Sequence, residues 1–276
     1  MRLLHIGDIV GKPGRRAVTD ALRGLVEEQR IDFVVANAEN SAAGSGLTPA
    51  NYNDLIGAGV NCITLGDHIY RRREIIPLLC NANNIVKPAN FPADAPGRTS
   101  AIVEARNGVR VGVISLLGRV FMRPVNCPWE AVDRELAGLP ADVRVVMVDF
   151  HAEATSDMQL MGRHLAGKVT SVLGTHTHVA TADEPILPGG TAFQCDIGMT
   201  GPHDSILGRR VDRVLQTTIT FNPSHFEVAT GDVRISATVV EADPATGRAS
   251  GVWRICADEN EIDRVSRLHR AKATRN

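Results

Sequence analysis

The 276-residue sequence predicts an α/β fold whose first part alternates parallel strands with helices. Three short apolar runs in the N-terminal third are each followed by a segment of helical periodicity, which is typical of repeated β-loop-α units. An acidic residue follows each run at intervals of about 30 residues, the length of one βαβ step. From about residue 191 the pattern changes to strands and turns, so the fold is not expected to be purely parallel.

Three β-loop-α units are predicted in succession in the N-terminal third. Their strands are expected over residues 2–6, 32–38 and 61–65, and their helices over 11–29, from 49 onwards and over 72–79. The second helix has the clearest start, because Thr48 is a favoured N-cap and Pro49 fits the first helical turn. Right-handed crossovers bring the carboxyl ends of parallel strands to one sheet edge, where open α/β proteins bind ligands.

The following segments predict mainly strands. Residues 100–106 and 109–117 are joined by Asn107-Gly108, a strong hairpin signal, so a second, antiparallel layer is expected to begin here. Further strands are predicted over residues 143–150, 169–173, 191–197, 217–221, 226–240 and 249–257, with a helix that ends near residue 165.

The last segment, residues 258–276, is charged. Ile262, Val265 and Leu268 share one face if this segment is helical. We expect a charged C-terminal tail or a short helix, attached to one domain over residues 1–257.

Composition narrows the class of ligand and the compartment. The formal net charge is −1 and the longest run of like charge is Arg71-Arg72-Arg73, which argues against duplex DNA or a membrane surface as a partner. We expect a small-molecule substrate and leave a homo-oligomer open. Five scattered cysteines, none in a C-x-x-C pair, suit free thiols in a reducing compartment. Neither a signal-peptide core nor a membrane-spanning run is evident, so a cytoplasmic location is expected.

Side chains with metal-ligand chemistry follow five of the predicted strands. They are Asp8, Glu39 with Asn40, Asp67, His151, and the pair His176 and His178. Each one alone is a common turn or strand-end residue, and two loop histidines without a metal are an equal alternative for the pair. In extended backbone, however, His176 and His178 project to the same side and can converge on one ion or on two adjacent ions. Together at one sheet edge, these side chains predict a metal site.

The chemistry of these donors indicates the kind of metal. Oxygen and imidazole donors without thiolate favour manganese, iron or zinc. Seven donors exceed what one ion needs, whereas two ions with a bridging carboxylate would use them all. Such pairs, about 3.5–4 Å apart, catalyse in-line displacement at phosphorus.

His68 is expected to face the substrate, because it directly follows Asp67 and adjacent residues in extended backbone point in opposite directions. A histidine there can protonate a leaving oxygen, since its pKa lies near working pH. The alternative is a hydrogen bond that supports a ligand. Lys12, Arg71 to Arg73 and Arg119 could meet a phosphate, but solvated surface charges are the more common interpretation.

The motifs around these residues resemble the YmdB-type branch of the calcineurin-like metallophosphoesterases, over residues 1 to about 257. The motifs are Gly7-Asp8, Ala38-Glu39-Asn40, Gly66-Asp67-His68, Asp149 to Thr155, Gly174 to His178, Pro88 to Pro92 and Asp196 to Pro202. The wider superfamily usually has a histidine where this chain has Val10, a loss that the branch shares. The branch normally has asparagine where this chain has Asp67.

The resemblance implies a four-layer αββα sandwich with mixed sheets and a centre of two iron or manganese ions. It also implies phosphodiesterase activity on cyclic nucleotides, notably the 2′,3′-cyclic kind and also the 3′,5′-cyclic kind. The implied ligands of the first metal are Asp8, Glu39, Asn40 and His178. Those of the second are Glu39, Asp67, His151 and His176, with His68 as the proton donor.

Two other functions remain open from the sequence. One is a regulatory or RNA-associated binding protein on a weakly active metallophosphoesterase scaffold. The other is a mononuclear amidohydrolase-like enzyme, which also uses two histidines one residue apart. That class normally carries the pair on its first strand, whereas here it comes late in the chain.

Overall fold

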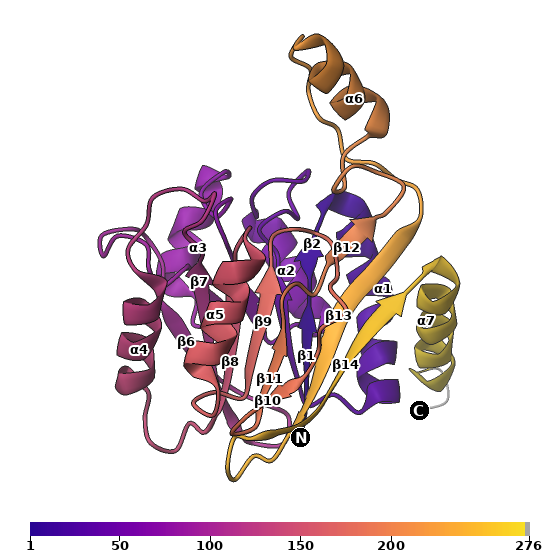
Figure 1. The fold of residues 1–276 in the computed structure, drawn as a ribbon. Coiled ribbons are helices and arrows are strands. Elements are labelled where there is room, and N and C mark those ends of the chain that lie inside the picture. The colour runs from indigo at the N-terminus through magenta and orange to yellow at the C-terminus, as the bar shows by residue number, and fades with distance from the viewer. Residues whose placement is uncertain (274–276) are drawn as a thin grey trace.

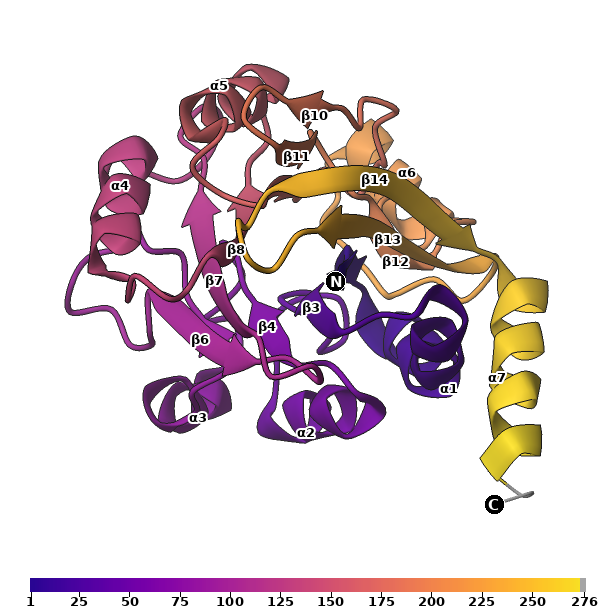
Figure 2. The same ribbon diagram turned by 90° about the horizontal axis from the view of Figure 1, so that it is seen from below.

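Two mixed β-sheets pack face to face, and helices cover the outer face of each sheet (Figures 1 and 2). The computed structural model describes residues 1–273. Apolar side chains of both sheets, among them Phe33, Val113 and Met147, form the core between the sheets. Strands buried on both faces read as continuous apolar runs, which explains why the N-terminal strands could be predicted.

The first sheet has eight strands in the order β2-β12-β13-β1-β3-β4-β5, with β14 paired to β13. The strands are β1 (Arg2–Ile6), β2 (Asp8–Ile9), β3 (Phe33–Asn37), β4 (Cys62–Thr64), β5 (Ile85–Val86), β12 (Met199–Pro202), β13 (Val233–Ala242) and β14 (Ala249–Ala257). Strands β1, β3, β4 and β5 are parallel, whereas β13 is antiparallel to β1. The three predicted β-loop-α units therefore form the parallel half of a mixed sheet.

The second sheet has six strands in the order β10-β11-β9-β8-β7-β6. They are β6 (Ser100–Glu104), β7 (Arg110–Leu117), β8 (Val145–His151), β9 (Ser171–Thr175), β10 (Ile186–Leu187) and β11 (Thr191–Gln194). The hairpin at Asn107-Gly108 joins β6 to β7 as predicted, but the antiparallel layer is wrong, because β7, β8, β9 and β11 are parallel. A helix between β7 and β8 provides the crossover that parallel strands need, and the sequence patterns did not predict it.

Helices lie on both outer faces. On the first sheet these are α1 (Gly11–Gln29), α2 (Pro49–Ala58), the 3₁₀ turn η1 (Arg73–Ile75) with α3 (Ile76–Asn81), and α7 (Glu259–Ala273). On the second sheet these are α4 (Pro128–Gly138) and α5 (Thr155–Leu165). Thr48 caps α2 as predicted, because its Oγ1 accepts a hydrogen bond from Asn51 N at 3.2 Å. No helix within residues 1–273 combines the length and apolar character needed to cross a bilayer.

The predicted strand over residues 217–221 is wrong. These residues end α6 (Val211–Thr220), a helix that projects from the body and buries none of its residues (Figure 1). Val211, Leu215 and Ile219 recur at helical spacing. Within residues 1–273 no strand pairs with the β-branched residues 217–220, so their preference for strands has no effect. The strand predicted over 226–240 begins only at Val233, because residues 221–230 return from α6 as a loop.

The C-terminal segment packs against α1 through one face of α7. Ile262 and Val265 are buried, whereas Leu268 is 51% exposed. Gly24 of α1 allows the close approach, since a Cβ there would collide with the backbone carbonyl of Val265. Residues 274–276 of the predicted tail lie outside the described residues.

We predict that Val265→Ala lowers the free energy of unfolding by about 1–2 kcal/mol, from about 0.8 kcal/mol for each buried methylene-sized group that is removed. Urea denaturation of the full chain measures this change. Leu268→Ala on the same helix is the matched control and should stay within about 0.5 kcal/mol of the parent. Equal effects of the two substitutions would show that α7 behaves in solution as an undocked tail.

Candidate metal centre

Four side chains with metal-ligand chemistry meet at the carboxyl-terminal edge of the two sheets. Glu39 follows β3, Asp67 follows β4, His151 ends β8 and His176 follows β9. One ligand atom from each lies within 4.8 Å of the others, and this is the cluster of such donors found within residues 1–273. We refer to these four residues as the His-carboxylate cluster.

His151 lies at the middle of the cluster. Its Nε2 is 3.0 Å from Glu39 Oε1, 3.3 Å from Asp67 Oδ1 and 3.0 Å from His176 Nδ1. Burial opposes charge on His151, but Glu39 and Asp67 raise the pKa of its imidazole well above the ordinary value. The pKa of His176, by contrast, is lowered by burial and by the charge of His151. The negative field that holds a proton here would equally hold a cation.

Glu39 provides the clearest test of whether these residues fit a metal. Its Oε2 accepts hydrogen bonds from Gly66 N at 2.7 Å and from His68 N at 2.9 Å. Its Oε1 is buried and forms no hydrogen bond of good geometry within residues 1–273, and it faces the ring nitrogens of His151 at 3.0 Å and of His68 at 3.6 Å. Burial raises the pKa of this carboxyl, but the His151 imidazole outweighs that effect and holds it below its ordinary value. An ionised, buried oxygen that faces only imidazole nitrogens is costly unless a proton or a metal cation lies between them, so the residues fit a metal ion.

A buried hydrogen-bond chain orients His151. Thr175 Oγ1 donates to Asp149 Oδ1 at 2.7 Å, so its oxygen must accept the contact from His151 Nδ1 at 2.9 Å. His151 therefore carries a proton on Nδ1 and turns Nε2 to the cluster. His176 is oriented similarly, with Nε2 3.1 Å from Glu153 Oε2 and Nδ1 facing His151. Such contacts are typical of metal-binding histidines.

A second group of polar side chains adjoins the His-carboxylate cluster. Asn40 Nδ2 is 3.3 Å from both Asp8 Oδ1 and His178 Nε2, and the last two atoms are 3.7 Å apart. His68 joins this group through Nδ1, which is 2.7 Å from Asn40 Oδ1 and 3.6 Å from Glu39 Oε1. All eight site residues predicted from the sequence thus lie at one sheet edge, four in the cluster and four beside it.

The predicted geometry of the histidine pair is wrong. The strand ends at Thr175, and His176 and His178 have φ angles of 110° and 66°, outside extended backbone. Their side chains consequently separate, one into the His-carboxylate cluster and the other toward Asp8. Positive φ costs energy for residues other than glycine and persists where the surroundings enforce it.

Asp196 contributes most to holding His176 and His178 in this backbone conformation. It is absent from the site residues predicted from the sequence. Its Oδ2 accepts hydrogen bonds from Thr177 N at 2.8 Å and Thr177 Oγ1 at 2.9 Å, and Asp8 Oδ2 accepts from His176 N at 2.9 Å. Burial, with a contribution from Asp8, raises the pKa of Asp196 to about 8. Asp149, Thr175 and Glu153 were also given no role. All four residues, Asp149, Glu153, Thr175 and Asp196, stood in motifs that resemble the family, which was the signal in the sequence.

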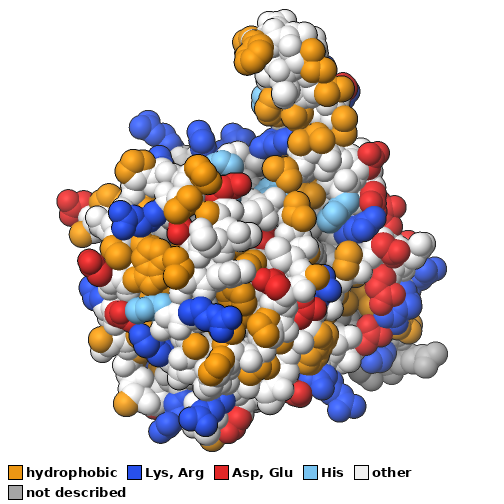
Figure 3. Space-filling model, in the orientation of Figure 1, with side chains coloured by type: hydrophobic (Ala, Val, Ile, Leu, Met, Phe, Trp, Pro, Cys, Tyr) orange, Lys and Arg blue, Asp and Glu red, His pale blue; other side chains and the backbone are white. Residues whose placement is uncertain are grey.

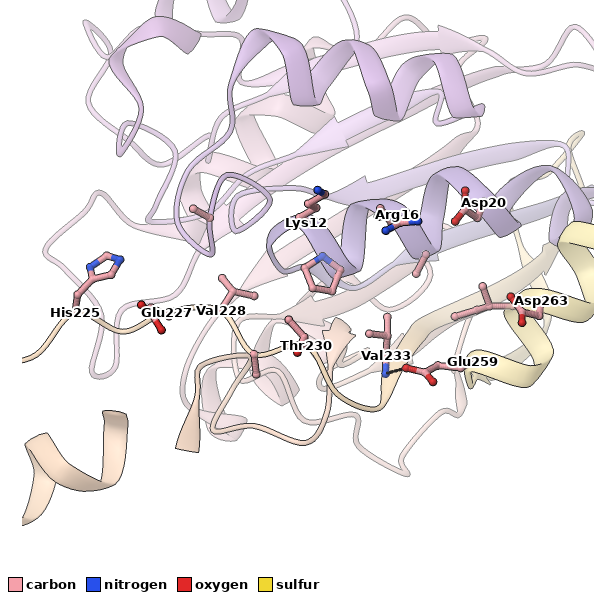
Figure 4. Close-up of a pocket in the computed structure, with 15 residues that line it drawn as sticks. Lys12, Arg16, Asp20, His225, Glu227, Val228, Thr230, Val233, Glu259 and Asp263 are labelled. Carbon is pink, nitrogen blue, oxygen red and sulfur yellow. Dashed lines mark hydrogen bonds between the residues drawn. The ribbon is translucent and has the colours of Figure 1, made fainter. Parts of the chain in front are cut away.

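Cavity size does not locate this site. A cavity of about 780 Å³ lies between the start of α1, the loop before β13 and α7 (Figure 4). Lys12, Arg16, Asp20 and Glu259 are among its lining residues, and none of the eight site residues lines it. The candidate metal centre is instead recognised by its donor atoms, several of which remain partly exposed at the sheet edge.

The chain is similar to several known proteins over almost its whole length. The chain is 40% identical to a 2′,3′-cyclic-nucleotide 2′-phosphodiesterase of Bacillus subtilis, over 95% of this chain and 99% of that one. A protein of Thermus thermophilus, described only as hypothetical, has a solved structure with a TM-score of 0.87 and 39% identity, covering 94% of this chain and 100% of that one. A phosphatase structure from Mycoplasma pneumoniae has a TM-score of 0.86 and 29% identity, covering 96% of both chains.

The two solved structures match the whole arrangement of the α/β fold with its two mixed sheets, and the named relatives are a phosphodiesterase and a phosphatase. The sequence model of one protein family, described as YmdB-like protein, matches residues 4–255, a range that includes all eight candidate site residues. The chain therefore belongs to the YmdB-like family.

Proposed function

We propose that this protein is a binuclear metal-dependent phosphodiesterase that hydrolyses cyclic nucleotides, with 2′,3′-cyclic nucleotides as its first substrate class and 3′,5′-cyclic nucleotides as a second. The observation that carries the proposal is the His-carboxylate cluster, whose four ligand atoms lie within 4.8 Å of one another and include the buried Oε1 of Glu39. A second ion is supported by the closeness of Asp8 Oδ1 and His178 Nε2, which are 3.7 Å apart with the Asn40 amide beside both. The activity named for the Bacillus subtilis relative supports the choice of substrate.

The residues divide between two ions that share Glu39. Asp8, Glu39, Asn40 and His178 would hold one ion, and Glu39, Asp67, His151 and His176 would hold the other. Iron or manganese suits these oxygen and imidazole donors best, and zinc is also compatible. When bound, the two ions supply Lewis acidity for the phosphoryl oxygens and acidify a water molecule.

His68 is the residue we assign to proton transfer. Its Nδ1 contacts Asn40 Oδ1, so Nε2 is the ring nitrogen left to meet the departing ribose oxygen. Its backbone N–H donates to Glu39 Oε2, which ties the position of the proton donor to the carboxylate shared by both ions. General acid catalysis requires this kind of fixed geometry.

The layered architecture supports the proposed phosphodiesterase function. We infer that the two sheets with their outer helices correspond to the four-layer αββα sandwich of the calcineurin-like metallophosphoesterases, with residues 1–257 as the catalytic domain. In open α/β folds the carboxyl-terminal edge of the strands is the usual place for a ligand site.

Hydrolysis assays with added manganese test the proposal directly. We expect turnover of both bis-p-nitrophenyl phosphate and 2′,3′-cyclic AMP by protein that contains two ions per chain. Absence of turnover by fully metallated protein would favour the alternative, a regulatory or RNA-associated binding protein. About one ion per chain in active protein would instead favour a mononuclear hydrolase.

We predict that His176→Ala and His178→Ala each lower the metal content by one ion per chain, because the two side chains belong to different groups of donors. Glu39→Gln should lower it by more than either, since Glu39 is shared. Elemental analysis of protein purified without chelators measures the content. His164→Ala is the control, because His164 pairs with Asp133 on the surface, and an equal loss of metal in that variant would show that the site is misplaced.

We predict that His68→Ala keeps both ions but loses activity on substrates with poor leaving groups by roughly 10²–10⁴-fold, the usual contribution of general acid catalysis. The loss should be much smaller for bis-p-nitrophenyl phosphate, since nitrophenolate departs without protonation. Rates for both substrates and metal content are measured side by side. Equal losses on the two substrates would remove the proton-donor role.

We predict that Asp67→Asn raises phosphodiester turnover while weakening retention of the ion held by the His-carboxylate cluster. Burial disfavours charge on Asp67, but His151, His68 and His176 hold the pKa of its carboxyl well below the usual range, so it carries a full negative charge. Removing that charge makes the centre more attractive to an anionic substrate and acidifies bound water more strongly. Rate and metal content at matched pH are the measurements. Unchanged occupancy with lower activity would show that the charge argument has the wrong sign.

A further inference from the structure

The loop after β7 places an aromatic ring in an unfavourable position. Phe121 is 89% exposed and has a φ of 60°. It is the third residue of a turn that Met122 N closes by donating to Arg119 O at 3.3 Å. Turns with positive φ at this position favour glycine or asparagine. Neither the backbone nor burial therefore explains a phenylalanine here, and such a conflict with local preference is expected at functional sites.

This turn lies beside the metal centre. The register of the second sheet pairs Leu117 with His151, and Gly118 N donates to His151 O at 2.9 Å. Phe121 follows Gly118 by three positions in the chain, so their Cα atoms are at most about 11 Å apart. The turn that carries the ring therefore begins next to the backbone of His151, a member of the His-carboxylate cluster.

The turn is also held in place. The buried carboxylate of Asp157, in the first turn of α5, accepts hydrogen bonds from Arg119 N at 2.9 Å and Val120 N at 3.0 Å. The partly buried side chain of Met122 packs against the core of the first sheet. The exposed ring of Phe121 is therefore presented from a fixed backbone, which lowers the entropy cost of binding a ligand to it.

Charge on the same loop favours an anionic ligand. The side chains of Arg119 and Arg123 are exposed and have neither an ion pair nor a hydrogen bond within residues 1–273. Lys and Arg side chains also gather along this edge of the molecule, next to exposed histidine (Figure 3). Phe121 thus has an unpaired guanidinium group two residues away in the chain on either side. This combination suits a nucleotide, whose base can stack on the ring while the guanidinium groups attract its phosphate.

We infer that Phe121 is the platform on which the base of the nucleotide substrate stacks, an assignment that rests on the proposed phosphodiesterase function. Recognition by stacking reads the flat face of the base rather than its edges. The enzyme should consequently accept all four bases with modest differences.

The test compares a nucleotide with a substrate that has no base. Phe121→Asn keeps a residue that tolerates positive φ, so it is expected to fold. It should lower kcat/KM for 2′,3′-cyclic AMP by roughly 10-fold, about 1.4 kcal/mol, the order expected for one stacked base. The loss should be mainly in KM. Activity on 1-O-methylribose 2,3-cyclic phosphate should stay within about 2-fold of the parent.

Phe221 offers a matched control within the same chain. It is 90% exposed, has a φ of 56° and follows α6, which projects from the body. Phe221→Asn should leave both substrates unaffected, and Phe121→Trp should retain activity on 2′,3′-cyclic AMP. In chelator-treated protein, the fluorescence of the Phe121→Trp variant should change on addition of 2′,3′-cyclic AMP and not of the base-free compound.

Three outcomes would overturn the inference while leaving the proposed function intact. They are equal losses on both substrates in Phe121→Asn, no loss on either, or the same loss in Phe221→Asn. If the metallated parent protein hydrolyses neither substrate, the phosphodiesterase proposal itself fails. In that case a fluorescence change specific to the nucleotide would still support base stacking at Phe121.

Discussion

The geometry of the candidate metal centre depends on the carboxylate of Glu39. Backbone N–H groups of Gly66 and His68 fix its Oε2, and Oε1 is thereby left among two imidazoles and a second carboxylate. Both amide donors come from the loop after β4, while Glu39 itself follows β3. The two neighbouring parallel strands thus fix Glu39, the proposed shared ligand, and His68, the proposed proton donor, relative to each other. A displacement of one strand end would disturb both.

The buried polar groups behind the centre explain how this arrangement persists. Asp149 accepts hydrogen bonds from Thr64, Asn37 and Thr175, and through Thr175 it orients His151. Burial of a carboxylate is unfavourable unless its oxygens are satisfied, so the network must form as a unit. Asp196 has the corresponding role under His176 and His178, where it holds a strained backbone in place. The two aspartates support ligands without belonging to the proposed ligand set.

At this edge of the molecule, the residues that the hydrophobic core stabilises differ from those that are candidates for binding. The apolar cores on both sides of each sheet account for the rigidity of the strand ends. The residues in left-handed backbone near the centre, His176, His178 and Phe121, gain little from that core. Their strain is consistent with roles in binding, because selection for folding alone would favour glycine or asparagine at such positions.

The sequence by itself determined the parallel half of the first sheet and the meeting of Asp8, Glu39 and Asp67 at one edge. Hydrophobic periodicity, the N-cap at Thr48 and the handedness of crossovers are local or general rules, so they can be read without a structure. Only the tertiary structure decided that α6 is a helix, that the second sheet is mostly parallel, and that His176 and His178 leave extended backbone. These features depend on contacts with distant segments, such as the hold of Asp196 on Thr177, and short-range patterns do not encode such contacts.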